Sequence, residues 1–118
     1  MAYVDGFLVA VPKKKLNEYK KLAKLGCKVW REHGALDYKE CVADDVPMGK
    51  ITSFPRAVKQ KPGETVIFAW ITYKSRADRD RINKKVMADP RFGGMDIKKM
   101  PFDAKRMIYG GFKVIVEA

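Results

Sequence analysis

The segment richest in reactive side chains lies near the C-terminus, where Asp103, Arg106 and Tyr109 follow one another closely. A guanidinium group binds anions, and a phenol donates a hydrogen bond. Gly110 and Gly111, which follow directly, have no side chains and leave space beside the strand. This space suits a small anionic or carbonyl-bearing molecule. The structural alternative is that Arg106 pairs with a carboxylate such as Asp103, and that the glycines admit a neighbouring backbone.

Four further residues are candidate ligand contacts: Asp5, His33, Glu40 and Trp70. Asp5 interrupts an apolar strand, so it either pairs with a nearby cation such as Arg106 or supplies a polar group to a pocket. His33 suits proton transfer near neutral pH, although a histidine at the end of a helix commonly stabilises the helix dipole. Glu40 can serve as a general base if it is buried, whereas an edge-strand carboxylate is usually solvated.

The cysteines and the single histidine do not form a metal motif. Cys27 and Cys41 lack CxxC or CxxH spacing, and His33 does not complete a zinc set with them. We expect no metal, no cofactor and reduced thiols. No apolar run approaches the length of a membrane span. The N-terminus runs directly into a strand pattern without an early positive charge, so we expect a cytoplasmic protein rather than a secreted one.

A basic face is predicted on the first helix. The chain has 25 Lys and Arg against 14 Asp and Glu, a net charge of +11, which favours anionic partners. The basic residues of this face are Lys20, Lys21, Lys24, Lys28 and Arg31. Because such a stripe contacts phosphates, RNA or DNA binding is the alternative function. No aromatic residue lies among them and no helix-turn-helix follows, so a solvated face with weak, non-specific binding is favoured.

The periodicity of apolar residues outlines the elements that position these side chains. The 118 residues, 47% of them hydrophobic, match one domain spanning 1–118. The predicted strands are Tyr3–Val11, Ala35–Ala43, Thr65–Tyr73 and Met107–Glu117, with a short extra strand at Phe54–Lys59. The first predicted helix is Lys13–His33, which has an apolar stripe at three- and four-residue steps that includes Tyr19, and which Gly34 ends. The second is Ser75–Asp89, where Ser75 and Asp78 resemble a capping box and Pro90 ends the helix. An irregular segment containing Gly93 and Gly94 follows. The order βαββαβ predicts an α+β, ferredoxin-like sandwich: a four-stranded antiparallel sheet with both helices on one face.

The central strands are apolar on both faces, which bears on assembly. In the first strand Phe7 and Val9 alternate with Leu8 and Ala10, and the strand at 65–73 repeats this pattern. Strands of this kind belong in a sheet that is covered on both sides. Since the helices cover only one face, we predict that a second copy of the sheet covers the other, giving a homodimer.

The segment 68–73 also fits part of the RNP1 pattern of RNA-recognition motifs, which share this topology. Val66 and Ile67 replace the basic residue and glycine of that pattern. The strands are nearly apolar, and the basic charge lies on a helix instead of the sheet. We therefore interpret this match as a buried β pattern.

Four longer motifs connect the chain to known sequences: YVDGF at 3–7, GAL at 34–36, DVPMGK at 45–50 and MPFDAKRMIYGGF at 100–112. Together they resemble the YbaA-like family of small bacterial proteins, nearly end to end. The resemblance implies a dimeric α+β barrel, a superfamily that also contains cofactor-independent monooxygenases, muconolactone isomerase-like proteins and ligand-sensing domains. That family has no established chemistry, so the resemblance implies a fold and a dimer but no reaction. We expect small-molecule binding or a cofactor-independent enzyme, with the pocket between sheet and helices.

Overall fold

Strands β1 (Tyr3–Pro12) and β3 (Glu64–Tyr73) form the centre of the sheet and pair along their whole lengths. In this computed structural model, which describes residues 2–93 and 95–118, the strand order is β2-β3-β1-β4. All three neighbouring pairs are antiparallel. The edge strands are β2 (Asp37–Val42) and β4 (Ile108–Lys113).

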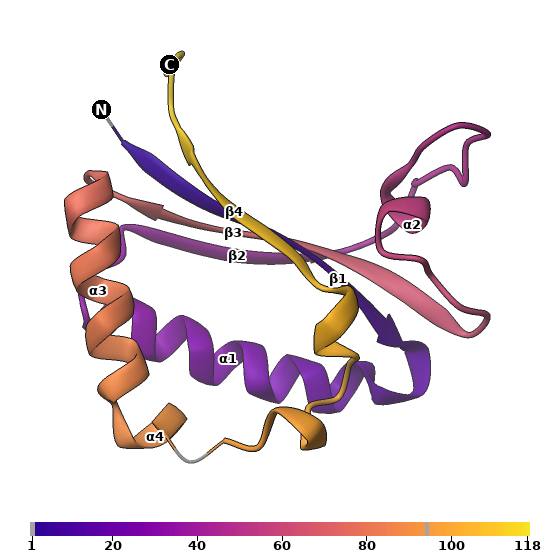
Figure 1. Cartoon of the computed structure of the whole chain (residues 1–118), viewed down its shortest axis with the longest axis horizontal. Coiled ribbons are helices and arrows are strands. Elements are labelled where there is room, and N and C mark those ends of the chain that lie inside the picture. Colours follow the sequence, from indigo (N-terminus) through magenta and orange to yellow (C-terminus); the bar gives the residue numbers. More distant parts are fainter. Residues whose placement is uncertain (1, 94) are drawn as a thin grey trace.

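Helices α1 (Leu16–Glu32) and α3 (Arg76–Ala88) lie on the same face of the sheet (Figure 1). The order of strands and long helices confirms the predicted ferredoxin-like α+β fold. The shorter elements are α2 (Phe54–Ala57), α4 (Pro90–Gly93) and 3₁₀ turns at Lys13–Lys15, Ile97–Lys99 and Ala104–Arg106. In the part of the chain that is described, no helix has both the length and the apolar character needed to cross a bilayer.

The helix-covered face of the sheet holds most of the core. One cluster joins the sheet to the start of α1 and consists of Val9, Val11, Tyr19, Ile67 and Ala69. A second joins the sheet to both long helices and consists of Val29, Ala35, Ile71, Tyr73, Ile82 and Val86. The i, i+4 spacing of Ile82 and Val86 directs both toward the sheet. The apolar periodicity of the sequence thus places α1 and α3 on this face.

The ends of the long helices follow from local chemistry. Ser75 caps α3, because its hydroxyl accepts a 3.1 Å hydrogen bond from the Asp78 backbone N–H, as predicted. Gly34 follows α1 with φ of +118°, a conformation that a side chain would disfavour. Gly94, in the predicted irregular linker, lies outside the described residues.

The extra strand predicted at Phe54–Lys59 is wrong, since this segment forms helix α2. The Ser53 hydroxyl caps the turn by accepting from the Arg56 N–H at 3.1 Å. Pro55, inside the first turn, has no N–H to donate to a strand. A proline and a capping serine therefore outweighed the apolar residues of the segment.

Several other elements are shorter than predicted. The last strand ends at Lys113 instead of Glu117, because Lys113 already pairs with Tyr3 at the start of β1 and the register runs out there. The second strand is Asp37–Val42, and the helix predicted from Lys13 begins with a 3₁₀ turn before α1.

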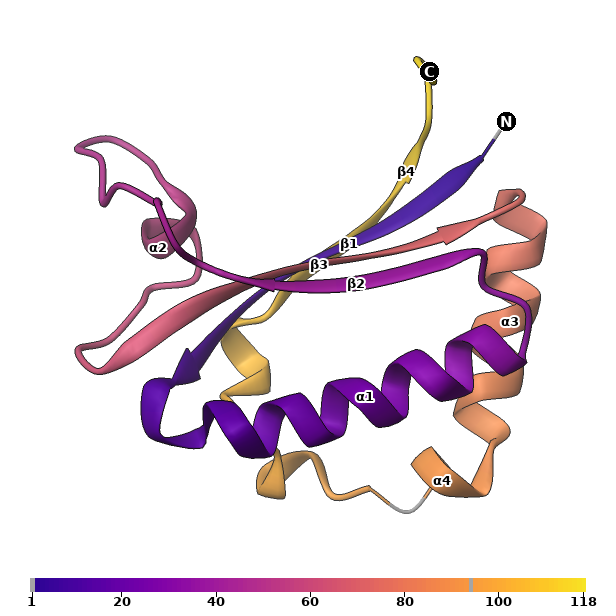
Figure 2. The ribbon, with the colours of Figure 1, turned by 180° about the vertical axis from the view of Figure 1, so that it is seen from behind.

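The sheet face opposite the helices is covered only in part. The chain between β2 and β3 folds over one end of it (Figure 2), where Ala10, Val58 and Val66 form a small core. Phe68 and Phe112 on the same face remain 42% and 64% exposed. The prediction that this face needs cover from outside the chain therefore applies only to the remaining area.

Candidate functional site

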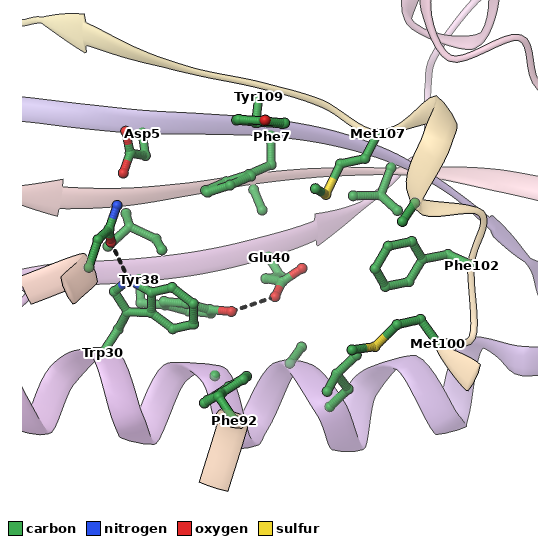
Figure 3. Close-up of a pocket in the computed structure, with 18 of the residues that line it drawn as sticks. Asp5, Phe7, Trp30, Tyr38, Glu40, Phe92, Met100, Phe102, Met107 and Tyr109 are labelled. Atoms are coloured by element: carbon green, nitrogen blue, oxygen red, sulfur yellow. Dashed lines mark hydrogen bonds between the residues drawn. The ribbon is translucent and has the colours of Figure 1, made fainter. Parts of the chain in front are cut away.

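A cavity of about 690 Å³ lies between the sheet and the helices. The apolar side chains labelled around it in Figure 3 are Phe7, Trp30, Phe92, Met100, Phe102 and Met107. They come from β1, α1, α4 and the segment that leads into β4. A cavity of this volume accommodates a small organic molecule. Its position matches the pocket that was predicted between sheet and helices.

The Glu40 carboxylate lies in the middle of this apolar surface. Its Oε2 accepts a 2.7 Å hydrogen bond from the Tyr38 hydroxyl (Figure 3), and its Oε1 accepts one from the Tyr19 hydroxyl. Alternation along β2 directs Tyr38 and Glu40 to the same face of the sheet. Gly26 of α1 leaves room for this arrangement, because a Cβ there would lie 2.7 Å from the Tyr38 hydroxyl oxygen.

Both tyrosines donate to Glu40 as neutral phenols. Burial raises the pKa of Tyr19 and of Tyr38 well above the ordinary value, and the adjacent Glu40 carboxylate raises each further. The two phenols therefore stay protonated at neutral pH. A carboxylate has about four lone-pair sites, so roughly two of those on Glu40 remain for another donor.

Asp5 and Arg79 form an ion pair on another part of the cavity wall, with Asp5 Oδ1 2.9 Å from Arg79 Nη1. The guanidinium carbon of Arg79 also lies 4.9 Å from the centroid of the Tyr3 ring, and its Nε lies 2.8 Å from Asp80 Oδ1. Asp5 therefore combines both predicted roles, because it is paired with an arginine and it lines the cavity. The charge of Arg79 is balanced by two carboxylates.

Asn83 supplies a neutral polar group to the wall. Its Oδ1 accepts hydrogen bonds from Trp30 Nε1 at 3.0 Å and from the Tyr73 hydroxyl at 3.2 Å. Burial raises the pKa of Tyr73, so this phenol also remains a donor. With its oxygen engaged twice, Asn83 has the Nδ2 amide to offer a ligand.

Arg106 lies outside the cavity lining. Its guanidinium donates to both oxygens of Glu64 at 2.8 and 2.7 Å and to Asp103 Oδ2 at 3.1 Å. It also donates to the Lys59 carbonyl at 3.0 Å. The predicted structural alternative, a pair with Asp103, is present, and Glu64 is a second partner. Tyr109 does line the cavity but is 71% exposed, so the structure does not bring it to one site with Arg106.

Two other candidate residues also lie away from the cavity. His33 Nε2 is 2.9 Å from Asp89 Oδ2 beyond the end of α1. Hydrogen bonds from Arg91 and from His33 lower the pKa of Asp89. Trp70 lies on the opposite sheet face, with its ring edge-to-face against Phe68 at 5.5 Å between centroids. Among the sequence-predicted contacts, Asp5, Glu40 and Tyr109 therefore line the cavity.

The predicted basic face lies on the outer side of α1. Its five side chains are exposed, namely Lys20, Lys21, Lys24, Lys28 and Arg31. Arg31 is partly engaged, because its Nη1 donates to the Ala35 carbonyl at 3.1 Å. This face points away from the cavity, so any contact with phosphates would be separate from the cavity.

Sequence reasoning did not select Tyr19, Arg79 or Asn83 for the site. Tyr19 belonged to the apolar stripe predicted for the first helix. Arg79 and Asn83 are four residues apart on α3, a spacing that places both on one side of the helix. That spacing, and the glycine in the middle of α1 opposite Tyr38, were the available signals.

The site offers a carboxylate acceptor, an amide donor and a large apolar surface. Such a set can hold a small molecule by its apolar body and orient it through Glu40. Glu40 is also the group placed to accept a proton from a bound molecule. Over residues 2–93 and 95–118, no group of three or more His, Cys, Asp or Glu side chains is arranged to hold a metal ion.

The fold and cavity together define a small ferredoxin-like α+β protein with a pocket between sheet and helices. The chain belongs to the family described as "Protein of unknown function (DUF1428)", whose model matches residues 2–104. It is 50% identical over 117 residues to "Uncharacterized protein YbaA" of Escherichia coli (strain K12), and equally to the protein of that name from Shigella flexneri, with 99% of each chain covered. The resemblance to the YbaA-like family is thereby confirmed.

A solved structure shares the fold at low sequence identity. It is described as a dimeric ferredoxin-like protein from an uncultured marine organism. The two chains cover each other completely, with a TM-score of 0.56 and 14% identity. At this identity the likeness supports the ferredoxin-like fold and no particular ligand.

Proposed function

We propose that the protein binds a small, largely apolar molecule in the cavity between the sheet and the helices. The observation that carries this proposal is a cavity of about 690 Å³ with apolar walls around a single carboxylate, Glu40, that two phenols hold in place. An apolar ligand would gain roughly 25 cal/mol for each Å² of its surface removed from water. The polar groups fix the orientation of the ligand, whether the outcome is storage, sensing or a cofactor-independent reaction.

A cavity-filling substitution tests this proposal. Ala23 lies on the cavity side of α1, so Ala23→Phe would occupy space that a ligand needs. Ala77→Phe introduces the same side chain at an exposed position of α3 and serves as the matched control. We expect 4-phenylbutan-1-ol to bind the parent and the Ala77→Phe variant in calorimetry and to lose most of its affinity for folded Ala23→Phe. Equal affinity for all three proteins would refute the cavity as the site.

The uncovered part of the sheet is proposed as the interface of a homodimer. Phe68, Ile108 and Phe112 are 42%, 41% and 64% exposed on this face, and Ile115 and Val116 after β4 are 84% and 85% exposed. Large contiguous apolar patches are uncommon on monomers. The related solved structure is described as dimeric, which supports the same assembly here.

Light scattering coupled to size exclusion tests the dimer. We expect a mass twice the 13.5 kDa of the chain and a shift toward the monomer for Phe68→Lys combined with Phe112→Lys. Met87→Lys is the control, because Met87 is 60% exposed on α3, which lies on the other side of the sheet. A parent protein that remains monomeric at high concentration would refute the interface.

A further inference from the structure

The cavity has an uncompensated negative charge at Glu40. The carboxylate is half-buried, and its protein hydrogen bonds come from two neutral phenols. In the described parts of the chain, no Lys, Arg or His forms an ion pair with Glu40. Removing a carboxylate from water without a cation is costly, so a bound cation would be stabilised beside it.

The cavity offers little to an anion. Its wall contains one cation within the described residues, Arg79, and this guanidinium is shared between Asp5 at 2.9 Å and Asp80 at 2.8 Å. The Asn83 amide and the Tyr109 hydroxyl, which are further donors in the lining, are neutral. Counting Asp5, Glu40 and Arg79, the charged groups of the lining sum to −1. An anionic ligand would therefore meet a negative charge and no free positive one.

Aromatic rings lie on both sides of Glu40. Trp30 packs edge-to-face on Phe92 with centroids 5.5 Å apart and lies 6.2 Å from the Tyr38 ring. Toward the other end, Tyr19 packs edge-to-face on Phe102 at 5.8 Å. Figure 3 shows Trp30, Tyr38 and Phe92 on one side of Glu40 and Phe102 on the other. Aromatic faces attract cations, and the attraction is stronger where water is displaced.

Together these observations identify a ligand class for the proposed cavity. We infer that the cavity binds a protonated amine with an apolar body, whose ammonium group lies against Glu40 among the aromatic rings. The inference rests on the proposed function, since it names the ligand of that same cavity. The ammonium N–H groups would donate to the free lone pairs of Glu40 and to the phenol oxygens of Tyr19 and Tyr38. The apolar body would extend toward Met100 and Phe102.

The positive net charge of the protein does not oppose this ligand strongly. The lysines of α1 are exposed on its outer side, where water and salt surround their ammonium groups. At physiological ionic strength the screening length is about 8 Å, so exposed charges act weakly across the helix. The contact partners inside the cavity, Glu40 and the aromatic rings, then decide which head group is preferred.

A matched set of three probes tests the inference. 4-Phenylbutylamine, 4-phenylbutan-1-ol and 4-phenylbutanoate share one apolar body and differ in the charge of the head group. Calorimetry at 0.15 M salt should give an affinity for the amine about tenfold higher than for the alcohol, with the acid weakest. In Glu40→Gln the advantage of the amine over the alcohol should disappear. Glu18→Gln, which removes an equal charge from the exposed side of α1, should retain it.

The outcomes separate the two proposals. If the alcohol binds and Ala23→Phe abolishes its binding while the amine gains no advantage, the amine inference is overturned and the cavity proposal stands. Preference for the acid would likewise overturn it and favour the anionic ligand predicted from the C-terminal motif. If none of the three probes binds the folded protein, both proposals fail. An advantage of the amine that persists in Glu40→Gln also overturns the inference, because the carboxylate would then not recognise the head group.

Discussion

Glu40 and Glu64 are two glutamates of the same sheet with opposite surroundings. Glu64, at the start of β3, is 8% exposed. Its carboxylate accepts hydrogen bonds from both Nη atoms of Arg106 at 2.7 and 2.8 Å and from the Lys61 backbone N–H at 2.6 Å. Glu40, half-buried on β2, accepts hydrogen bonds from two phenols and has no ion pair with a cation among the described residues. The first carboxylate is neutralised by its own chain, and the second is held in position but left charged.

The difference separates a structural role from the binding role that we propose for Glu40. A bidentate guanidinium satisfies charge and hydrogen bonds together, so Glu64 has little left to offer a ligand. Phenols satisfy hydrogen bonds without cancelling charge, and Glu40 faces the apolar walls of the cavity. Arg106, a candidate ligand contact for which the sequence also offered a structural ion pair, belongs to the structural pair. Glu40, the less conspicuous residue, lies in the cavity.

The largest effect is expected from breaking the neutralised pair. Arg106→Met keeps the aliphatic length but leaves Glu64 buried without its cation, which should lower the free energy of unfolding by about 3 kcal/mol. Urea denaturation followed by circular dichroism measures this. A loss below about 1 kcal/mol would mean that Arg106 is not holding the fold at this point and would reopen a ligand role for it.

A smaller loss is expected at Glu40. Glu40→Leu removes the acceptor of both the Tyr19 and the Tyr38 hydroxyl and should cost about 2 kcal/mol, because buried donors are left unpaired. Glu40→Gln keeps an acceptor and should cost less than about 1 kcal/mol. The same denaturation experiment compares the two variants. If Gln were as harmful as Leu, the charge of Glu40 itself would stabilise the fold, and the contrast with Glu64 would fail.

Gly26 tests how the Glu40 cluster is accommodated. Glycine to alanine within a helix normally stabilises by about 1 kcal/mol. Here the new Cβ would lie 2.7 Å from the Tyr38 hydroxyl, so Gly26→Ala should give no gain or a loss of about 1 kcal/mol as the bond to Glu40 is disturbed. In a Tyr38→Phe background the same substitution should become stabilising. A gain of full size in the parent would show that Tyr38 moves aside without cost.

Acid should weaken the Glu64 pair selectively. Hydrogen bonds from Arg106 lower the pKa of Glu64 in the folded state. The stabilisation is therefore complete above the ordinary glutamate pKa of about 4.3 and is lost as the pH falls through the lower folded value. Unfolding in urea at pH 7 and pH 3.5 should show a larger loss for the parent than for Arg106→Met. Equal losses would assign the acid sensitivity to other carboxylates.

The smallest effect concerns the basic face outside the cavity. Duplex DNA should bind weakly at low salt and lose most of its affinity between about 50 and 200 mM salt, because counterion release drives the binding. Lys24→Gln combined with Lys28→Gln should reduce this binding and leave the cavity probes unaffected. Binding that is sequence-dependent at physiological salt would instead favour the nucleic-acid function predicted as the alternative.

Sequence alone predicted most of the fold because the relevant signals are local. Alternating apolar residues indicated the strands, three- and four-residue spacing indicated α1, and Gly34 marked its end. The capping pattern at Ser75 and the proline at position 90 indicated α3. The extra strand at 54–59 failed where apolar content conflicted with Pro55 and the Ser53 cap. The Ser53 cap and Pro55 are also local signals in the sequence, and in that segment they outweigh the apolar residues.

The partners of the charged residues were decided only in the tertiary structure. Tyr19 and Glu40 are 21 residues apart, Arg106 and Glu64 are 42 apart, and Asp5 and Arg79 are 74 apart. Sequence determined that these groups exist and that each lies near a strand or helix. Which carboxylate receives a cation depends on strand register and on where each helix crosses the sheet, and both are set by packing of the whole core. For that reason a motif in the sequence pointed to Arg106, while the assembled fold left the uncompensated charge at Glu40.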